Sequence, residues 1–190
     1  PVVSVADVST TEGSPAQVVV SLSAPSATDV TVVLNTTNGT AVAPGDYTAQ
    51  TGLVVTIPAG QTSVTVPIPT TADALFEGNE TFSVALSSPT GATLGDADAT
   101  VTITDDDAQP VVSIDSPSAA EGDPMVFTVS LSNPSATDVT VTLNTANGTA
   151  VAPGDYTAQT GLVVTIPAGS TSATVSVPTI EDAIFEGNET

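Results

Sequence analysis

The feature that most constrains the fold is an internal repeat that runs through the chain. Residues 1–81 align without a gap with residues 110–190, and 60 of these 81 pairs are identical. The match is unbroken between Asn38–Gly60 and Asn147–Gly169. Chance does not produce such similarity, so the sequence indicates a tandem array of one structural unit. We predict two domains, copy 1 over residues 1–109 and copy 2 over residues 110–190.

Short segments rich in Val, Thr and Ile predict β-strands in each copy, separated by turns that contain Gly or Pro. Seven such segments over about 100 residues are typical of a two-sheet immunoglobulin-like sandwich. The period of two places Phe82, Val84 and Leu86 on one inward face, opposite Val64, Val66 and Ile68, with Val101 and Ile103 also inward. We therefore predict an all-β chain of tandem immunoglobulin-like seven-stranded β-sandwiches, with strands in copy 1 at residues 2–6, 17–22, 29–35, 53–57, 63–68, 81–86 and 100–104.

The second copy ends at Thr190, which aligns with Thr81. Copy 2 is therefore expected to be incomplete, without its last two strands. A sandwich without these strands leaves an open edge and an uncovered apolar face. We expect the chain to be a segment of a longer array.

The charge of the chain excludes several classes of partner. Its 21 Asp and Glu residues are accompanied by no Lys, Arg or His, which gives a formal charge of -21. Nucleic-acid binding requires Lys and Arg at the phosphates, so we expect no nucleic-acid partner. No apolar run approaches the roughly 20 residues that span a bilayer, so we expect no membrane insertion. Because the chain has no Cys, we expect metal ions or neighbouring repeats, instead of disulfides, to contribute to its stability.

Most candidate functional residues are acids at turns, where the predicted strands end. Adjacent carboxylates repel one another by about 1 kcal/mol at 4 Å in water and more at a shielded surface. A hard cation with six to eight oxygen ligands relieves this repulsion, and Ca²⁺ suits flexible carboxylate-rich loops better than Mg²⁺. The candidates in copy 1 are Glu12, Asp46, Asp73, Glu77 and the run Asp105, Asp106 and Asp107.

An ordered set of short motifs runs through the chain. In copy 1 the motifs are Thr11-Glu12-Gly13, Gly39-Thr40-Ala41, Gly45-Asp46-Tyr47, Ile57-Pro58-Ala59-Gly60, Phe76-Glu77-Gly78-Asn79-Glu80-Thr81-Phe82 and Ile103-Thr104-Asp105-Asp106-Asp107. Taken together, these motifs resemble one known family, the Calx-β repeat. The resemblance implies an immunoglobulin-like sandwich that binds Ca²⁺ at the end where the last strand exits.

The resemblance also implies a set of metal ligands. In copy 1 it adds the carbonyl of Leu75 to the seven acids. In copy 2 the implied ligands are Glu121, Asp155, Glu181, Asp182, Glu186 and the carbonyl of Ile184. Ala72 and Ala74 stand where calcium-sensing members often carry Asp, which predicts one or two ions in copy 1. Copy 2 has no counterpart of the Asp105–Asp107 run, so its site is expected to be incomplete.

Other interpretations remain open for these residues. The acids could be solvated turn residues that only confer solubility. Asp46 could be a turn residue beside Tyr47 packed on the sandwich edge. Glu80 and Glu189 are predicted to face solvent, and Phe76 and Phe185 are predicted to be core residues beneath the site.

The residue inventory argues against an enzyme. Without His, Cys, Lys or Arg, nucleophilic triads and Schiff-base chemistry have no groups to use. A glycosidase would need paired carboxylates and usually aromatic platforms, and the chain has no Trp and two Tyr.

The leading hypothesis is a calcium-binding structural repeat that stiffens and extends a secreted or cell-surface protein of many repeats, such as an adhesin stalk. Its partners would be neighbouring repeats, with homo-assembly or a cell-surface ligand also open, and its location extracellular. The alternative is a calcium-dependent adhesion module that contacts a surface, a polysaccharide or another subunit.

Overall fold

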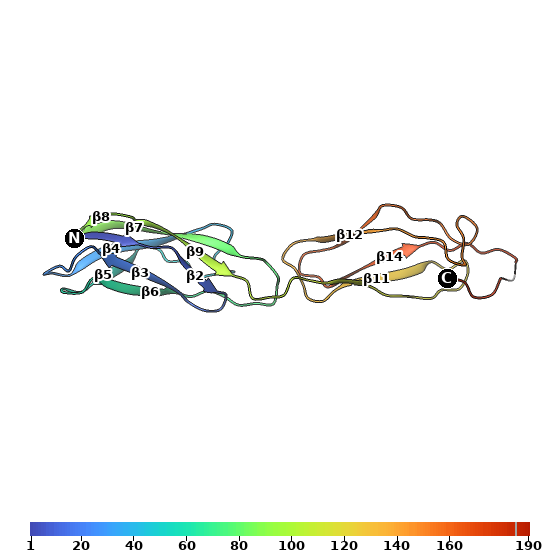
Figure 1. The fold of residues 1–190 in the computed structure, drawn as a ribbon, viewed down its shortest axis with the longest axis horizontal. Helices are drawn as coiled ribbons and strands as arrows, with labels where there is room; N and C mark the ends of the chain where they lie inside the picture. Colours follow the sequence, from blue (N-terminus) through green and yellow to red (C-terminus); the bar gives the residue numbers. More distant parts are fainter. Residues whose placement is uncertain (185) are drawn as a thin grey trace. The chain divides into compact units, whose positions relative to one another are not determined.

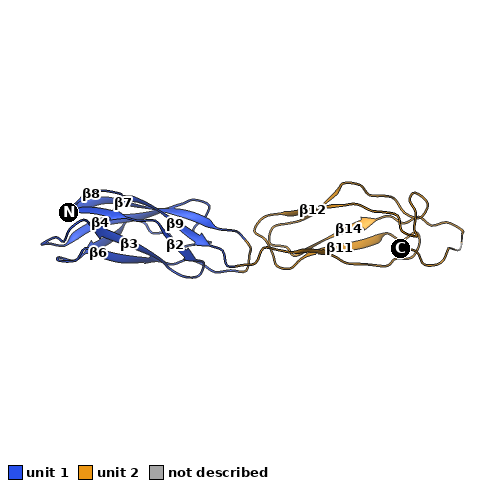
Figure 2. Cartoon of the chain, viewed as in Figure 1, with its two compact units in different colours: residues 1–73, 77–106 blue, residues 74–76, 107–190 orange. Residues whose placement is uncertain are grey.

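The chain folds into two compact units that contain β-strands and loops (Figures 1 and 2). A computed structural model describes residues 1–184 and 186–190; the predicted core residue Phe185 lies outside this set. Unit 1 comprises residues 1–73 and 77–106, and unit 2 comprises residues 74–76 and 107–190. Within the described residues there is no helix of sufficient length and hydrophobicity to cross a membrane.

Unit 1 is a sandwich of two sheets, as predicted. One sheet has the order β6-β3-β1-β8 and the other has the order β2-β9-β7-β4-β5. Neighbouring strands are antiparallel except in the pairs β1–β8 and β2–β9, which are parallel. The strands are β1 (Val2–Val5), β2 (Val8–Thr11), β3 (Ala16–Leu22), β4 (Val30–Asn38), β5 (Leu53–Ile57), β6 (Ser63–Ile68), β7 (Glu80–Thr90), β8 (Thr93–Leu94) and β9 (Asp98–Thr104).

The N-terminal segment of unit 1 contributes to both sheets. The first predicted strand corresponds to β1, which pairs with β3, while β2 follows two residues later and pairs with β9 in the opposite sheet. Asp7 lies at the crossing and its Oδ1 accepts a hydrogen bond from the backbone N of Thr100 at 2.7 Å. This crossing fixes β2 beside β9, and β2 and β8 are added to the seven predicted strands.

The core of unit 1 lies between the sheets and follows the predicted alternation. Phe82, Val84 and Leu86 of β7 are buried. Of the residues predicted opposite them, Val66 and Ile68 are buried, and Val64 is half-buried against the core. The prediction of the inward faces is therefore confirmed for β6 and β7.

Two aromatic predictions are corrected by the structure. Tyr47 is not on the sandwich edge but fully buried, with its ring stacked on Phe82 at a centroid distance of 3.9 Å. Phe76 is half-buried and lies in neither hydrophobic core. Its backbone instead bonds within unit 2, where its N donates to Pro134 O and its O accepts from Ala136 N, both at 3.1 Å.

Unit 2 repeats five strands of unit 1 with the same register. β10 (Val112–Ile114), β11 (Met125–Leu131) and β14 (Ser172–Val177) form one sheet, and β12 (Val139–Leu143) pairs with β13 (Leu162–Ile166) in the other. They match β1, β3, β6, β4 and β5 in turn. In the described part of unit 2, no strands correspond to β7 and β9. This agrees with the prediction that copy 2 is without the last two strands of the sandwich. Its buried core consists of Val129, Leu131, Val164 and Ile166.

Candidate metal centre

Strand pairing brings distant acids to one end of unit 1. In the sheet order β2-β9-β7, Thr11 pairs with Thr104 and Glu80 pairs with Ile103. The residues that follow Thr11 and Thr104 are Glu12 and Asp105, so these two acids leave the sheet side by side, next to the start of β7. The loop from β6 to β7 supplies Asp73 and Glu77, and the loop from β4 to β5 supplies Asp46.

The first acidic cluster comprises Glu12, Asp105 and Asp107, whose carboxylate oxygens lie within 4.8 Å of one another. Glu12 is buried, with 9% of its surface exposed. Its backbone N donates to Thr104 O at 3.1 Å, and its Oε1 accepts from Asp73 N at 3.2 Å. Glu12 therefore links β9 to the loop between β6 and β7.

Asp105 organises the same loop through its side chain. Its Oδ2 accepts hydrogen bonds from Glu77 N at 2.8 Å and from Gly78 N at 2.6 Å. Gly78 has a φ of 76°, a left-handed conformation that is readily adopted by glycine. Asn79 Oδ1 in turn accepts from Asp105 N at 3.3 Å. Two backbone N–H groups of the turn after Phe76 thus bind the carboxylate of Asp105, and these hydrogen bonds orient Glu77.

The second acidic cluster comprises Asp46, Glu77 and Glu80, again with oxygens within 4.8 Å of one another. Asp46 Oδ2 accepts from Val42 N at 2.6 Å, which closes the tight turn that carries it. Asp46 is therefore both a turn residue and a member of a carboxylate cluster, so its place in the turn does not exclude a ligand role.

Burial and like charge raise the pKa values of the three glutamates in these clusters. Burial is the main cause for Glu12, whose pKa is raised despite the hydrogen bond from Asp73 N, and nearby Asp105, Asp73 and Asp106 add repulsion. Burial also raises the pKa of Glu77, with Asp46 the strongest neighbouring charge. For Glu80, burial followed by repulsion from Asp46 and a hydrogen bond with it raises the pKa to about 7. Burial and the neighbouring carboxylates thus disfavour full ionisation of these three glutamates.

The prediction that Glu80 and Glu189 face solvent is wrong. Both are half-buried and belong to acidic clusters. The spacing from Glu77 to Glu80 does not reveal this, because Glu80 begins β7 and its neighbour Asp46 comes from a loop 34 residues earlier in the sequence. Only the pairing of β7 with β4 brings them together.

Some predicted ligands of copy 1 lie outside its two clusters. Asp73 and Asp106 are exposed, and their charges act on Glu12 from the edge of the first cluster. Leu75 is half-buried between Asp73 and Glu77 in the sequence. The structure therefore brings five of the seven predicted acids of copy 1 into clusters and adds Glu80.

Unit 2 reproduces the second cluster but not the first among its described residues. Asp155, Glu186 and Glu189 lie with oxygens within 4.8 Å, and Asp155 Oδ2 accepts from Val151 N at 2.6 Å. Repulsion from Asp155 adds to desolvation in raising the pKa values of Glu186 and Glu189.

The other predicted ligands of unit 2 are exposed. Glu121 Oε1 accepts from Asp182 N at 2.8 Å, as in unit 1, but Glu121 is exposed where Glu12 is buried. Ile184 is 64% exposed, and its N donates to Asp182 Oδ1 at 2.6 Å. The exposed Glu181 belongs to no described carboxylate cluster. Glu121 and Asp182 thus keep the hydrogen bond that Glu12 and Asp73 form in unit 1, but their side chains are exposed.

The donor set fits a hard divalent cation. All side-chain donors are carboxylate oxygens, and the sequence contains no Lys, Arg or His that could neutralise them. Carboxylates with raised pKa values and no basic partner are stabilised by a cation with several oxygen ligands. In copy 1 the residues that would hold it are Glu12, Asp46, Glu77, Glu80, Asp105 and Asp107.

Comparisons with known proteins agree with this architecture. The Calx-beta domain model matches residues 3–107 and again residues 105–190. The chain is 22% identical to a solved structure described as CBD12 from CALX1.2, with a TM-score of 0.53, and this match covers 95% of the chain and 77% of the solved one. The calcium binding domain CBD12 of CALX1.1 matches with 22% identity and a TM-score of 0.52, over 95% and 76% of the two chains.

No curated protein matches the sequence. The solved structures establish the shared fold, and the family model covers both repeats. The chain therefore belongs to the Calx-beta domain family, of which it carries two copies.

Proposed function

We propose that the acidic end of unit 1 binds Ca²⁺ and that this binding gives the repeat its structural role. The observation that carries the proposal is the pair of three-carboxylate clusters, which have no basic residue to neutralise them. The first cluster accepts hydrogen bonds from the segment between Asp73 and Glu80, and the second includes Glu77 and Glu80 of that segment. Membership of the Calx-beta family supports it, as does the similarity to the calcium binding domain CBD12 of CALX1.1.

Bound Ca²⁺ would supply positive charge and oxygen coordination at the point where β2, β7 and β9 meet. The residues of this chain already orient the site, because Glu12 and Asp105 are tied to the β6–β7 loop by hydrogen bonds to Asp73, Glu77 and Gly78. A cation among these carboxylates would hold loops from four parts of the sequence together. The expected result is a stiffer end of the repeat next to the segment that leads into unit 2.

We propose that the protein is a calcium-stiffened repeat of a secreted or cell-surface protein, with neighbouring repeats as its partners. Calcium sites in extracellular modules have dissociation constants of about 10⁻⁴ to 10⁻³ M. The Ala residues at positions 72 and 74 reduce the carboxylate count of the β6–β7 loop, which favours an affinity in this weak range. Such a site is filled at extracellular calcium levels and empty at cytosolic ones.

Calorimetric titration of the metal-free chain with CaCl₂ tests the site. We expect saturable binding that is strongly weakened by Glu80→Gln, while Asp98→Asn leaves it unchanged. Asp98 is a suitable control because it is an exposed acid on β9 outside the clusters. Titration with no saturable heat, or equal weakening by both variants, would overturn the proposal.

The structural role needs a separate measurement. The chain has no Cys, so Thr56→Cys and Thr165→Cys, at equivalent exposed positions on β5 and β13, provide two unique sites for spin labels. If calcium stiffens the array, the distribution of distances between the labels narrows when calcium replaces EDTA. Saturable binding with an unchanged distribution would retain the calcium site but reject the stiffening role.

A further inference from the structure

Unit 1 has four sheet edges, and three of them carry a feature that opposes pairing with another strand. The edges are β6 and β8 in one sheet and β2 and β5 in the other. β6 contains Pro67, which has no N–H, β8 is only two residues long, and β2 lies between the charges of Asp7 and Glu12. Proline, short length and charge are features that protect sheet edges from association.

The fourth edge, β5, carries none of these features. Its residues Leu53–Ile57 include no charged residue and no Pro, and they pair with β4 in an unbroken register. Val54 on its outer face is 63% exposed. A regular, uncharged and exposed edge strand is a template for pairing with another strand.

The backbone of β5 has hydrogen-bonding groups at this free edge. In β4, Thr36 N donates to Gln50 O at 2.9 Å, on the side of β5. Successive residues of an antiparallel strand bond to opposite neighbours. Every second residue of β4, counted from Thr36, therefore bonds to β5, and this set includes the partner of Val55. The N–H and C=O groups of Val54 and Thr56 consequently face the free edge.

The strands on this side of unit 1 are neutral. β3, β4, β5 and β6 contain no Asp or Glu, although the chain has a formal charge of -21. Two copies of the chain repel each other through their acids, so repulsion is smallest where neutral strands meet. A basic protein would instead be attracted to the acidic clusters. The charge distribution therefore favours a second copy as the partner of β5.

An apolar hollow of about 410 Å³ lies between β5 and β6, and its lining includes Leu53, Val55, Val64 and Val66. In a strand added at the edge of β5, every second side chain would point to the same side as Leu53 and Val55. Apolar side chains at these alternate positions would shield the hollow from water.

The sequence of β5 has this alternation and is complementary to itself in the antiparallel orientation. When two copies of the strand pair about Val55, Val54 of each copy lies opposite Thr56 of the other, and Leu53 lies opposite Ile57. The N–H and C=O groups that face the free edge can then form reciprocal hydrogen bonds. Such a contact uses the same surface on both copies, as in a two-fold symmetric dimer.

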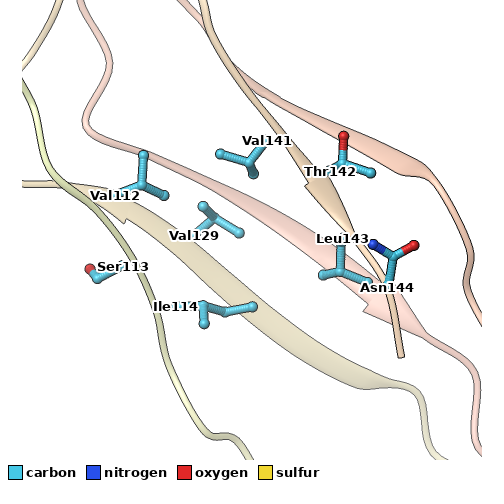
Figure 3. Close-up of a pocket in the computed structure, with 8 residues that line it drawn as sticks. All are labelled: Val112, Ser113, Ile114, Val129, Val141, Thr142, Leu143 and Asn144. Atoms are coloured by element: carbon cyan, nitrogen blue, oxygen red, sulfur yellow. The ribbon is translucent and has the colours of Figure 1, made fainter. Parts of the chain in front are cut away.

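Unit 2 has an equivalent edge. β13 has the same sequence as β5 and pairs with β12 in the register in which β5 pairs with β4. The hollow of unit 2 in Figure 3 is lined by residues of β10, β11 and β12 and by Asn144, with no residue of β13. The free edge of β13 is therefore separate from that hollow, and each chain has two equivalent pairing strands.

We infer that β5 is a self-association edge that binds, in antiparallel orientation, β5 or β13 of a second copy of the chain. Main-chain hydrogen bonds would give affinity, and the alternating side chains would give specificity. The acidic clusters take no part in this contact. The inference therefore goes beyond calcium binding and is tested without calcium.

The first test measures mass by sedimentation equilibrium in EDTA on the whole chain with Thr165→Pro. This substitution removes an N–H at the free edge of β13, so that β5 remains as the pairing strand and assembly stops at a dimer. We expect the mass to rise from one chain towards two between about 10 μM and about 1 mM. The dimer should be tighter in about 1 M NaCl than in about 0.01 M, because salt screens the repulsion between acids.

Two further substitutions in this background separate β5 from the opposite edge. Thr56→Pro removes a free-edge N–H of β5 and keeps the pairing with β4, so dimerisation should be at least about tenfold weaker. Thr65→Pro is the matched control, at an exposed Thr on the edge strand β6. Leu22 N donates to Thr62 O, so by the same alternation the N–H of Thr65 faces the free edge of β6. Dimerisation should be unchanged by this control.

Hydrogen exchange on the unchanged chain tests the same contact without a substitution. As the concentration rises, exchange should slow at the amides of Val54 and Thr56 and of their equivalents Val163 and Thr165. Exchange should stay the same at Val55, whose N–H already bonds to β4. This measurement decides the question even if Thr56→Pro lowers the stability of unit 1.

Three outcomes would overturn the proposal. The first is an unchanged chain that stays monomeric at about 1 mM in about 1 M NaCl. The second is equal weakening of the dimer by Thr56→Pro and Thr65→Pro, and the third is association that slows exchange only outside β5 and β13. Because every measurement is made in EDTA, each of these results would leave the proposed calcium site unaffected.

Discussion

At the scale of single residues, the acidic end of unit 1 depends on a few carboxylates that have both structural and electrostatic effects. Asp105 accepts backbone hydrogen bonds from Glu77 and Gly78, and these bonds stabilise the β6–β7 loop without a cation. Its charge has the opposite effect, because it raises the pKa of Glu12 and disfavours the fully ionised cluster. The two effects can be separated by substitution.

Asp105→Asn keeps one side-chain oxygen to accept those hydrogen bonds and removes the charge. In EDTA we expect the melting temperature to stay within a few degrees of the unchanged chain, because relief of repulsion offsets weaker hydrogen bonds. In calcium we expect the metal-dependent rise in melting temperature to be lost. Calorimetry with and without calcium checks this, with Asp98→Asn as the matched control. A full calcium-dependent rise in Asp105→Asn would contradict the prediction.

Glu80 makes stability depend on pH in a direction opposite to that of a salt-bridged acid. Its pKa is raised from an ordinary value of 4.5 to about 7 in the folded chain, mainly by burial and by repulsion from Asp46. Between these values the folded state binds more protons than the unfolded state, so the free energy of unfolding falls as pH rises through this window. Because Glu80 is only partly buried, we expect a loss on the order of 1 kcal/mol.

Denaturant titrations in EDTA between about pH 5 and pH 7.5 measure this slope. Glu80→Gln should flatten the profile, since it cannot ionise. Calcium should oppose the slope, because metal binding needs deprotonated carboxylates. Constant or rising stability of the unchanged chain in EDTA over this range would refute the assignment to Glu80.

At the scale of elements, β7 connects the core to the acidic end. Its first residue, Glu80, belongs to an acidic cluster, and Phe82 stacks on Tyr47, the residue after Asp46. The hydroxyl of Tyr47 donates to Asn38 Oδ1 at 2.7 Å, which ties the Asp46 turn to the end of β4. Packing of these rings therefore fixes the turn that carries Asp46.

The two units provide a matched comparison for this packing. Tyr156 donates to Asn147 Oδ1 at 2.7 Å, as Tyr47 does to Asn38, but Tyr156 is only half-buried. Tyr47→Ala should cost about 3–5 kcal/mol of stability in unit 1, as expected for a large core aromatic. Tyr156→Ala should cost clearly less in unit 2, because both variants lose the same hydrogen bond and only the first loses a fully buried ring. Urea denaturation of each variant checks the difference, and equal losses would contradict it.

The positions of most strands could be predicted from the sequence. The alternation in Phe82–Leu86 and Thr100–Thr104 correctly gives strands and their inward faces, because that signal is local. β2 was not predicted, because its pairing with β9 depends on residues more than 90 positions away. Tyr47 was misplaced for the same reason, since Phe82 comes from another strand.

At the scale of the whole molecule, the unbalanced charge is the dominant electrostatic feature. The formal charge of -21 has no internal compensation from Lys or Arg. Salt shortens the screening length from about 10 Å at 0.1 M to about 3 Å at 1 M. Repulsion among the acids should therefore weaken as salt increases.

We expect the melting temperature in EDTA to rise when NaCl is increased from about 0.01 M to about 1 M. Asp105→Asn should show a smaller rise, because part of its repulsion has already been removed. Calcium should stabilise the chain more than NaCl does at equal ionic strength, since coordination adds to screening. Scanning calorimetry under these three conditions makes the comparison. Equal stabilisation by CaCl₂ and NaCl would show that screening alone accounts for the effect, and it would contradict stabilisation by calcium coordination.

The sequence by itself determined that the chain is a tandem pair of β-sandwich repeats, because repetition and alternation are readable without knowledge of contacts. The sequence also showed that the chain has no Lys, Arg or His to pair with its acids, and it identified most of the acids that lie in clusters. Only the tertiary structure decided that Glu80 joins Asp46 and Glu77, and that Glu12 is buried while Glu121 is exposed. The physical reason is that proximity and burial depend on which strands pair, and β7 and β9 join residues that lie far apart along the chain.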